Sequence, residues 1–267
     1  MIYINAIIFG IVQGITEFLP ISSSGHLVVL HELISLPLKN EVAFDVALHL
    51  ATLFAIVYFF RTEAWQLFAA WAKSLKGERS VYGRLSWFII LGTIPAAFAG
   101  WLFDDYIETV LRSPIVVIIM LVLIGILFII FEKYSPRVKE YTALNARQTF
   151  AIGCAQALAL IPGTSRSGIT IIAGLGVGLQ REAAIRFSFL LSIPILAGAA
   201  VKKIPHLFDA GFQGNELAVM TVAFISAFLT AILTIRYFLR YARGHSLNVF
   251  ALYRFILAAV LVVYFLA

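Results

Sequence analysis

The chain has 267 residues, of which 61% are apolar and only 13% charged, with a formal net charge of +6. Soluble globular proteins carry about 45–50% apolar and about 25% charged residues, so the composition excludes a soluble enzyme, a disordered chain and a nucleic-acid-binding domain. The apolar residues also form long runs, such as the one from Pro114 to Phe131. A run of about 18 or more apolar residues indicates a transmembrane helix. The sequence therefore predicts an all-α polytopic membrane protein.

Six segments are long and apolar enough to cross a bilayer, since about 20 residues cross about 30 Å of hydrocarbon. They are 42–60, 85–103, 114–131, 184–200, 217–235 and 249–266. Two further apolar stretches, 2–36 and 148–181, are interrupted by Pro, Gly and Ser, so their pieces are too short to cross. Non-helical backbone at membrane depth has to be buried in protein or line a wet cavity. We therefore expect both stretches to be re-entrant helix pairs, which enter and leave on the same side.

Basic residues alternate between the predicted loops and indicate the orientation. The loops 61–84, 132–147 and 236–248 together hold twelve Lys and Arg residues, whereas the loops 104–113 and 201–216 hold three. Under the positive-inside rule, the first set lies in the cytoplasm. With six crossings, both termini are then predicted to lie outside.

The two interrupted stretches resemble each other at a constant offset of 143 residues. Eight of the 41 positions from Gly10 to Leu50 recur as identical residues 143 positions later, namely Gly10, Gln13, Ser22, Ser24, Gly25, Leu36, Phe44 and Leu48. Each half has one broken pair and three crossings, and because three is odd the halves run in opposite directions. The sequence predicts one membrane domain, 1–267, built as an inverted-topology repeat of about 1–143 and 144–267. In such folds the site lies where the broken elements meet near the midplane.

The first interrupted stretch holds an acidic, hydroxyl-rich motif from Gln13 to His26. Gln13 and Glu17 are four residues apart and share one helical face, and we expect Pro20 to end that helix before a Ser-Ser-Ser-Gly turn. A carboxylate inside the membrane costs at least about 2.5 kcal/mol, so a functional role for Glu17 is the default interpretation. Because Mg²⁺ binds oxygen ligands through few protein groups, Glu17 helped by Gln13 is a candidate cation site.

The second interrupted stretch holds glycines, four hydroxyls and one guanidinium between Pro162 and Thr170, just before an apolar helix. Successive N–H groups in such a turn form an anion-binding nest, and a helix N-terminus adds a favourable dipole. Arg166 supplies a planar fork suited to bidentate phosphate contact. This motif predicts an oxyanion site.

Together the motifs supply what phosphoryl transfer requires, which is charge neutralisation with a nucleophile and an acid or base nearby. Ser23 could attack phosphorus with His26 as the base, or His26 could attack directly. The sequence leaves both routes open.

The pairing of QGITEFLPISSSGH with PGTSRSGIT resembles the undecaprenyl-diphosphate phosphatase family of the bacitracin-resistance type, and the similarity extends to the late Tyr253-Arg254-Phe255. The resemblance implies hydrolysis of the C55 lipid diphosphate to the monophosphate, a divalent cation such as Mg²⁺ or Ca²⁺, and a site open to the outer face. It implies a bacterial cytoplasmic-membrane enzyme whose partners are the polyprenyl diphosphate and membrane lipids, without nucleic acid. A homodimer is a candidate assembly.

Carried over by position, the resemblance implies that Glu17, Ser23, His26 and Arg166 are catalytic. It implies a substrate-binding role for Gln13, Ser22, Ser24, Gly163, Thr164, Ser165, Ser167, Gly168 and Thr170. The first family position is Gln13 here, where many members have Glu. This lowers the local negative charge by one and weakens Gln13 as a metal ligand.

The sequence leaves two alternatives and gives one further expectation. An inverted-repeat secondary transporter or lipid-phosphate flippase is an alternative function, because broken helices and inverted repeats are typical of transporters. Asp45 and His49, four residues apart, either face the site or form a packed interhelical hydrogen bond. Arg254 is expected to be structural and bound to backbone carbonyls.

Overall fold

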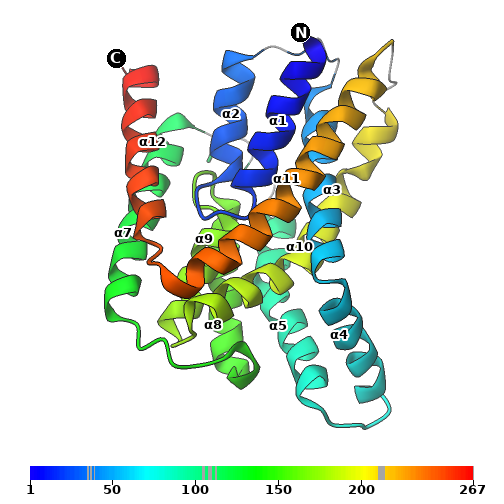
Figure 1. Cartoon of the computed structure of the whole chain (residues 1–267), viewed down its shortest axis with the longest axis vertical. Helices are drawn as coiled ribbons and strands as arrows, with labels where there is room; N and C mark the ends of the chain where they lie inside the picture. The colour runs from blue at the N-terminus through cyan, green and yellow to red at the C-terminus, as the bar shows by residue number, and fades with distance from the viewer. Residues whose placement is uncertain are drawn as a thin grey trace.

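The computed structural model describes residues 1–34, 36, 38, 40–103, 106–107, 110–111, 113–209 and 214–266. Within them every named element is a helix, which confirms the all-α prediction for this part of the chain (Figure 1). The α-helices are α1 (Ile2–Thr16), α2 (Ser23–Leu33), α3 (Glu41–Phe59), α4 (Arg61–Ser74), α5 (Val81–Leu102), α7 (Pro114–Tyr134), α8 (Ala146–Ala157), α9 (Arg166–Gly176), α10 (Arg181–Asp209), α11 (Glu216–Gly244) and α12 (Asn248–Leu266). The short 3-10 helices η1 (Tyr141–Ala143) and η2 (Leu158–Leu160) flank α8.

Six of the described helices, α3, α5, α7, α10, α11 and α12, are long and apolar enough to cross a membrane. They coincide with the six predicted spans. In α7 the Ser113 hydroxyl accepts a hydrogen bond from the backbone N–H of Val116, and Pro114 occupies the first turn, where its missing N–H costs nothing. Ile119, Ile126 and Ile130 form an exposed stripe on this helix, as expected where a helix faces lipid. The chain is a multi-pass membrane protein.

Two segments predicted as loops are helical, so these predictions were wrong. The segment 61–84 contains α4, and most of 236–248 continues α11 to Gly244. Similarly, α10 extends into the predicted loop 201–216 as far as Asp209. A run of Lys and Arg indicates that a segment lies outside the hydrocarbon, but these residues are good helix formers. Part of the predicted loop 104–113 lies outside the described residues.

Helices from the first half of the chain pack against helices from the second half. Helix α1 lies along α11, α8 along α5 and α7 along α12, while α3 and α10 contact each other in the interior. The α8–α5 contact depends on glycine, because a Cβ built on Gly153 would lie 2.6 Å from the carbonyl oxygen of Gly92. The absence of a side chain at Gly153 therefore allows the backbones of α8 and α5 to touch.

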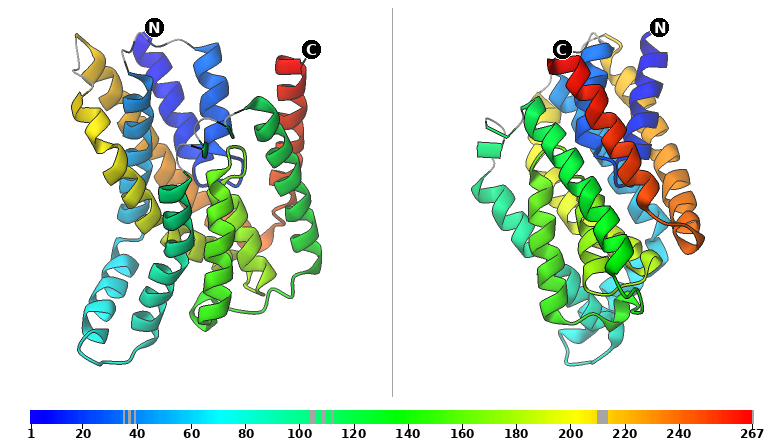
Figure 2. Two further views of the ribbon diagram at one scale, coloured as in Figure 1. Left: turned by 180° about the vertical axis from the view of Figure 1, so that it is seen from behind. Right: turned by 90° about the vertical axis from the view of Figure 1, so that its left-hand side faces the viewer.

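Two helix pairs, α1–α2 and α8–α9, point toward each other along the long axis of the molecule. The turn between α1 and α2 and the turn between α9 and the α8–η2 segment both lie in the interior (Figure 2, left). Both termini lie at one end of the molecule, and the α4–α5 connection lies at the other (Figure 1). This arrangement is what brings the two motifs into one region.

Ion pairs tie together helix ends far from the termini. The buried Glu132 carboxylate at the end of α7 binds Arg137 at 2.9 Å and Arg181 at 2.6 Å, and it also accepts the backbone N–H of Leu247. Nearby, the hydroxyl of Tyr141 donates to Glu63 at 2.6 Å. Burial, together with this hydrogen bond, raises the pKa of Tyr141.

We expect Gly153→Ala to lower stability, because the added methyl group overpacks the α8–α5 contact at a cost of about 1–3 kcal/mol. Gly198→Ala in α10 is the matched control, since nothing lies within 4 Å of a Cβ there and alanine favours a helix by about 1 kcal/mol. Thermal unfolding of the two variants in detergent should move in opposite directions. Equal midpoints would contradict the role assigned to Gly153.

Candidate active site

The first motif forms a turn that surrounds one carboxylate. Helix α1 ends at Thr16 rather than at Pro20, and Glu17 begins the turn. Its Oε2 accepts hydrogen bonds from Gln13 Nε2 at 3.1 Å and from the Ser23 hydroxyl at 2.9 Å. Gln13 and Glu17 therefore share one face, as their spacing predicts.

The second motif repeats the local geometry of the first. Ser22 and Ser165 both have positive φ, at 75° and 70°, and each caps the helix that follows by accepting a backbone N–H, from Gly25 and Gly168 respectively. Each capping hydroxyl also contacts the hydroxyl two residues later, at 3.3 Å in the first turn and 3.2 Å in the second. Such φ values are uncommon for residues other than glycine, so the shared strain marks two closely related turns.

Charge and hydrogen bonds join the two turns. Arg166 Nη2 donates to Glu17 Oε1 at 3.0 Å across 149 residues of sequence, and both side chains are largely buried. The hydroxyl of Ser167 donates to the carbonyl of Leu19 at 3.2 Å. The two sequence motifs thus lie in one site.

Arg254 binds the backbone of both turns. Its guanidinium is fully buried and donates to the carbonyl oxygens of Pro20 in the first turn and of Gly163 and Thr164 in the second. It also binds carbonyls of α7, at Met120 and Leu121. The expectation that Arg254 binds backbone carbonyls is confirmed.

The hydroxyl of Ser23 points toward Glu17, and His26 has other partners. In the described part of the chain no hydrogen bond joins Ser23 to His26. Instead His26 Nδ1 lies 2.7 Å from the carbonyl oxygen of Ser22, and Nε2 lies 2.6 Å from the hydroxyl of Tyr253 on α12. Tyr253 was not among the predicted site residues; the available signal was its place in the Tyr253-Arg254-Phe255 segment.

His49 of α3 completes the surroundings of Glu17. Its Nδ1 lies 3.0 Å from Gln13 Nε2 and 3.4 Å from Glu17 Oε2, with the ring partly exposed. Asp45, one turn earlier, pairs with His31 at 3.0 Å instead. Of the two residues whose role was left open, His49 contacts the site and Asp45 forms an interhelical hydrogen bond.

The other predicted binding residues lie in three kinds of surroundings. Ser24 is exposed and Ser165 half-buried at the turns, so both lie near the surface of the site. Thr170 is buried, and its hydroxyl bonds to Ser188 at 2.6 Å and to carbonyls of its own helix. Gly163 is needed for the backbone, since its φ is +90° and a Cβ would lie 2.6 Å from the carbonyl oxygen of Val117.

Several buried polar atoms at the site have no hydrogen-bond partner among the residues that the structure describes. They are Gln13 Oε1, Thr164 Oγ1 and Arg166 Nε. Buried polar groups are nearly always satisfied, so these three atoms are suited to a polar ligand. Arg166 Nε is a cationic donor that would take an anion, whereas Gln13 Oε1 is an acceptor that would take a cation or a proton donor.

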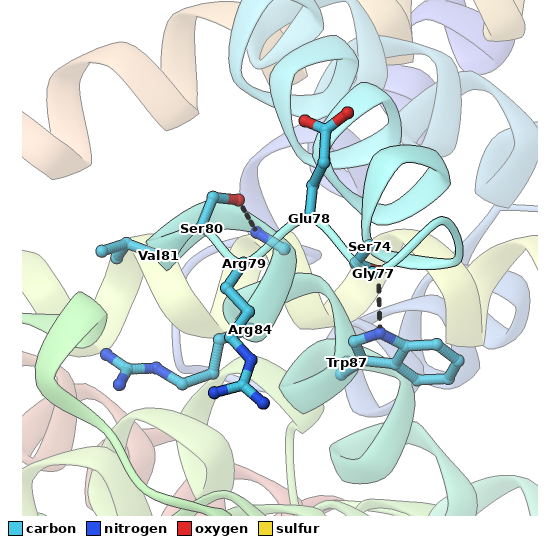
Figure 3. Close-up of a pocket in the computed structure, with 9 residues that line it drawn as sticks. Ser74, Gly77, Glu78, Arg79, Ser80, Val81, Arg84 and Trp87 are labelled. Carbon is cyan, nitrogen blue, oxygen red and sulfur yellow. Dashed lines mark hydrogen bonds between the residues drawn. The ribbon is translucent and has the colours of Figure 1, made fainter.

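A surface cavity of about 730 Å³ lies elsewhere, at the α4–α5 connection (Figure 3). It is lined by residues between Ser74 and Trp87, with the indole N–H of Trp87 donating to Ser74 and the guanidinium groups of Arg79 and Arg84 on one side. None of the residues of the two motifs lines it. This cavity is therefore separate from the region where the two turns meet.

Comparison with known proteins agrees with the two motifs. The family model described as bacitracin resistance protein BacA matches residues 6–260. The chain is 41% identical over 260 residues to an undecaprenyl-diphosphatase of Rubrobacter xylanophilus, covering 96% of each chain. It is 43% identical over 266 residues to undecaprenyl-diphosphatase 2 of Stutzerimonas stutzeri, covering 98% of each. The chain therefore belongs to the BacA family of bacitracin resistance proteins.

Proposed function

We propose that the chain hydrolyses undecaprenyl diphosphate to undecaprenyl phosphate and inorganic phosphate, and so recycles a lipid carrier for cell-wall synthesis in the bacterial cytoplasmic membrane. Relatives that carry the name undecaprenyl-diphosphatase match nearly the whole chain. The observation that carries the proposal is the Glu17–Arg166 contact at 3.0 Å, which joins the hydroxyl-rich turn to the anion-binding turn.

Arg166 is the residue that would hold the terminal phosphate. Glu17 binds one edge of its guanidinium, while the buried Nε has no partner in the described part of the chain. A phosphate oxygen at Nε would satisfy this donor with a charge-assisted hydrogen bond. The Ser165-capped N-terminus of α9 adds backbone N–H groups and a favourable dipole.

Ser23 is the nucleophile that the contacts favour, with Glu17 in place of His26 as its base. The Ser23 hydroxyl already donates to Glu17, so its proton passes to the carboxylate as Oγ bonds to the terminal phosphorus. The bond from phosphorus to the bridging oxygen breaks, and the lipid monophosphate leaves.

Water completes the reaction. His26 lies three residues after Ser23 and thus on the same face of α2, where its Nε2 would take a proton from water. The water oxygen bonds to phosphorus, the bond to Ser23 breaks, Oγ recovers its proton from Glu17, and His26 releases the proton it took from water to the solvent. Inorganic phosphate is released.

The donor set at the first turn fits a divalent cation. Gln13 Oε1, beside the Glu17 carboxylate, is a buried oxygen to which no described residue forms a hydrogen bond. Among the described residues no group of three or more His, Cys, Asp or Glu side chains surrounds a common point. Mg²⁺ is often held by one or two protein oxygens together with phosphate and water. We propose that Gln13 and Glu17 hold a cation that neutralises charge on the diphosphate.

The topology is proposed as an inverted repeat with two re-entrant pairs. Support comes from the matching turns at Ser22 and Ser165 and from reciprocal packing, in which α1 contacts α11 and α8 contacts α5. At the 143-residue offset α1 corresponds to α8 and α5 corresponds to α11, so the two contacts are equivalent. The basic α4–α5 connection would lie in the cytoplasm and both termini outside. A homodimer stays a prediction.

We expect Arg166→Ala, Glu17→Ala and His26→Ala each to lower phosphate release from a polyprenyl diphosphate by about 100-fold or more, because each removes charge stabilisation or proton transfer. Arg79→Ala, Glu78→Ala and His245→Ala are matched controls at exposed positions. Initial rates of the purified proteins in detergent give the comparison. Near-wild-type rates in all three site variants would refute the site, and a wild-type protein that binds the lipid without releasing phosphate would support the transporter instead.

Ser23→Ala separates the nucleophiles. If Ser23 attacks, this variant loses hydrolysis to the same extent as Glu17→Ala, whereas Ser24→Ala, one residue further on, loses much less. Rapid quenching of the wild type should also trap phosphate on the peptide that contains Ser23. Activity that survives in Ser23→Ala would favour attack by His26 or by water.

Removal of divalent cations should abolish phosphate release, and Mg²⁺ or Ca²⁺ should restore it. Because a carboxylate binds these cations more strongly than an amide does, Gln13→Glu should lower the cation concentration needed for half-maximal rate. Titration of chelator-treated protein measures both effects. Full activity in excess chelator would exclude the proposed cation.

A further inference from the structure

The imidazole of His26 is held at both nitrogens. Nδ1 lies 2.7 Å from the carbonyl oxygen of Ser22. A carbonyl oxygen only accepts hydrogen bonds, so Nδ1 carries the hydrogen and donates. Ser22 has a positive φ of 75°, and the capping bond from Gly25 N–H to its side chain helps to hold this conformation. The strained residue therefore selects one tautomer of His26.

Nε2 is then the acceptor of a neutral ring, and Tyr253 supplies its hydrogen bond. The two atoms are 2.6 Å apart. No carboxylate forms an ion pair with His26 in the described part of the chain, and the nearby Arg254 is positively charged and bound to carbonyls. These surroundings favour a neutral imidazole over a protonated one. The Tyr253 hydroxyl thus donates to the bare Nε2.

This hydrogen bond joins two helices that have different packing partners. Helix α2 lies against α1, and α12 lies against α7. The rings of His26 and Tyr253 are nearly parallel, at 11° and 5.6 Å between centroids. Tyr253 is 41% exposed, so this hydrogen bond between α2 and α12 lies at an accessible surface.

We propose that Tyr253 is a positioning residue for the hydrolytic step. Its hydroxyl holds the His26 ring so that the unprotonated Nε2 is directed at the accessible side. During hydrolysis the reacting water takes the place of the Tyr253 hydroxyl at Nε2. The proposal rests on the proposed function, because it assigns His26 as the base. It adds that a residue 227 positions away in sequence sets the direction and tautomer of that base.

The test compares Tyr253→Phe with Tyr264→Phe, an exposed tyrosine on the same helix. Phenylalanine keeps the ring contact and removes only the hydroxyl. Diethyl pyrocarbonate acylates unprotonated imidazole nitrogens, so mass spectrometry of the peptide that contains His26 reports access to Nε2, with His26→Ala marking the site. We expect Tyr253→Phe to raise the acylation rate of His26 about three- to tenfold, the value of one hydrogen bond, and Tyr264→Phe to leave it unchanged.

Steady-state kinetics complete the test. A ring that is less well oriented lowers kcat about tenfold, while KM stays near the wild-type value because the phosphate contacts of Arg166 are intact. An unchanged acylation rate, or an unchanged kcat, in Tyr253→Phe would overturn the proposal. Failure of the proposed function is a separate result, since the wild-type protein would then release no phosphate while the acylation measurement still reports the hydrogen bond.

Discussion

The buried guanidinium of Arg254 is the constraint on which the site depends. It binds carbonyl oxygens of both turns and of α7, and the described contacts show no carboxylate beside it. A buried cation is costly unless its donors are satisfied. Movement of either turn would therefore be unfavourable, because it would leave a buried N–H of the guanidinium without its carbonyl acceptor. The turns are thereby fixed relative to each other, and an uncompensated positive charge remains behind a site that would bind an anion. One residue supplies both the rigidity and part of the electrostatic attraction.

The Glu17–Arg166 pair follows from the same balance of charges. Each residue alone would be an unpaired ion at membrane depth, and the pair with its hydrogen bonds neutralises both in the absence of substrate. A diphosphate could take over part of the guanidinium from Glu17, which would leave the carboxylate more able to accept the Ser23 proton. Binding and activation of the nucleophile would then be coupled through Arg166, without any movement of the two turns.

Much of this architecture could be predicted from the sequence because it depends on local rules. The six spans follow from apolar run length, and the shared face of Gln13 and Glu17 follows from helical spacing. The helical state of α4 was missed because charge marks the side of a membrane rather than a conformation. The partners of His26 could not be found either, since no local pattern connects it with Tyr253 across 227 residues. Only the tertiary structure, in which α2 packs on α1 and α12 packs on α7, brings these two side chains within hydrogen-bond distance.

Equivalent positions in the two turns show how related geometry serves different chemistry. Counted at the 143-residue offset, Glu17 corresponds to Leu160, Ser23 to Arg166 and His26 to Ile169. Two copies of the acidic turn would place like charges opposite each other, and two copies of the basic turn would do the same with cations. Because the turns meet, one acidic and one basic copy is the arrangement that neutralises both. The division that we propose, between a turn that carries the nucleophile and base and a turn that binds phosphate, thus agrees with the packing of two similar turns face to face in a medium of low dielectric constant.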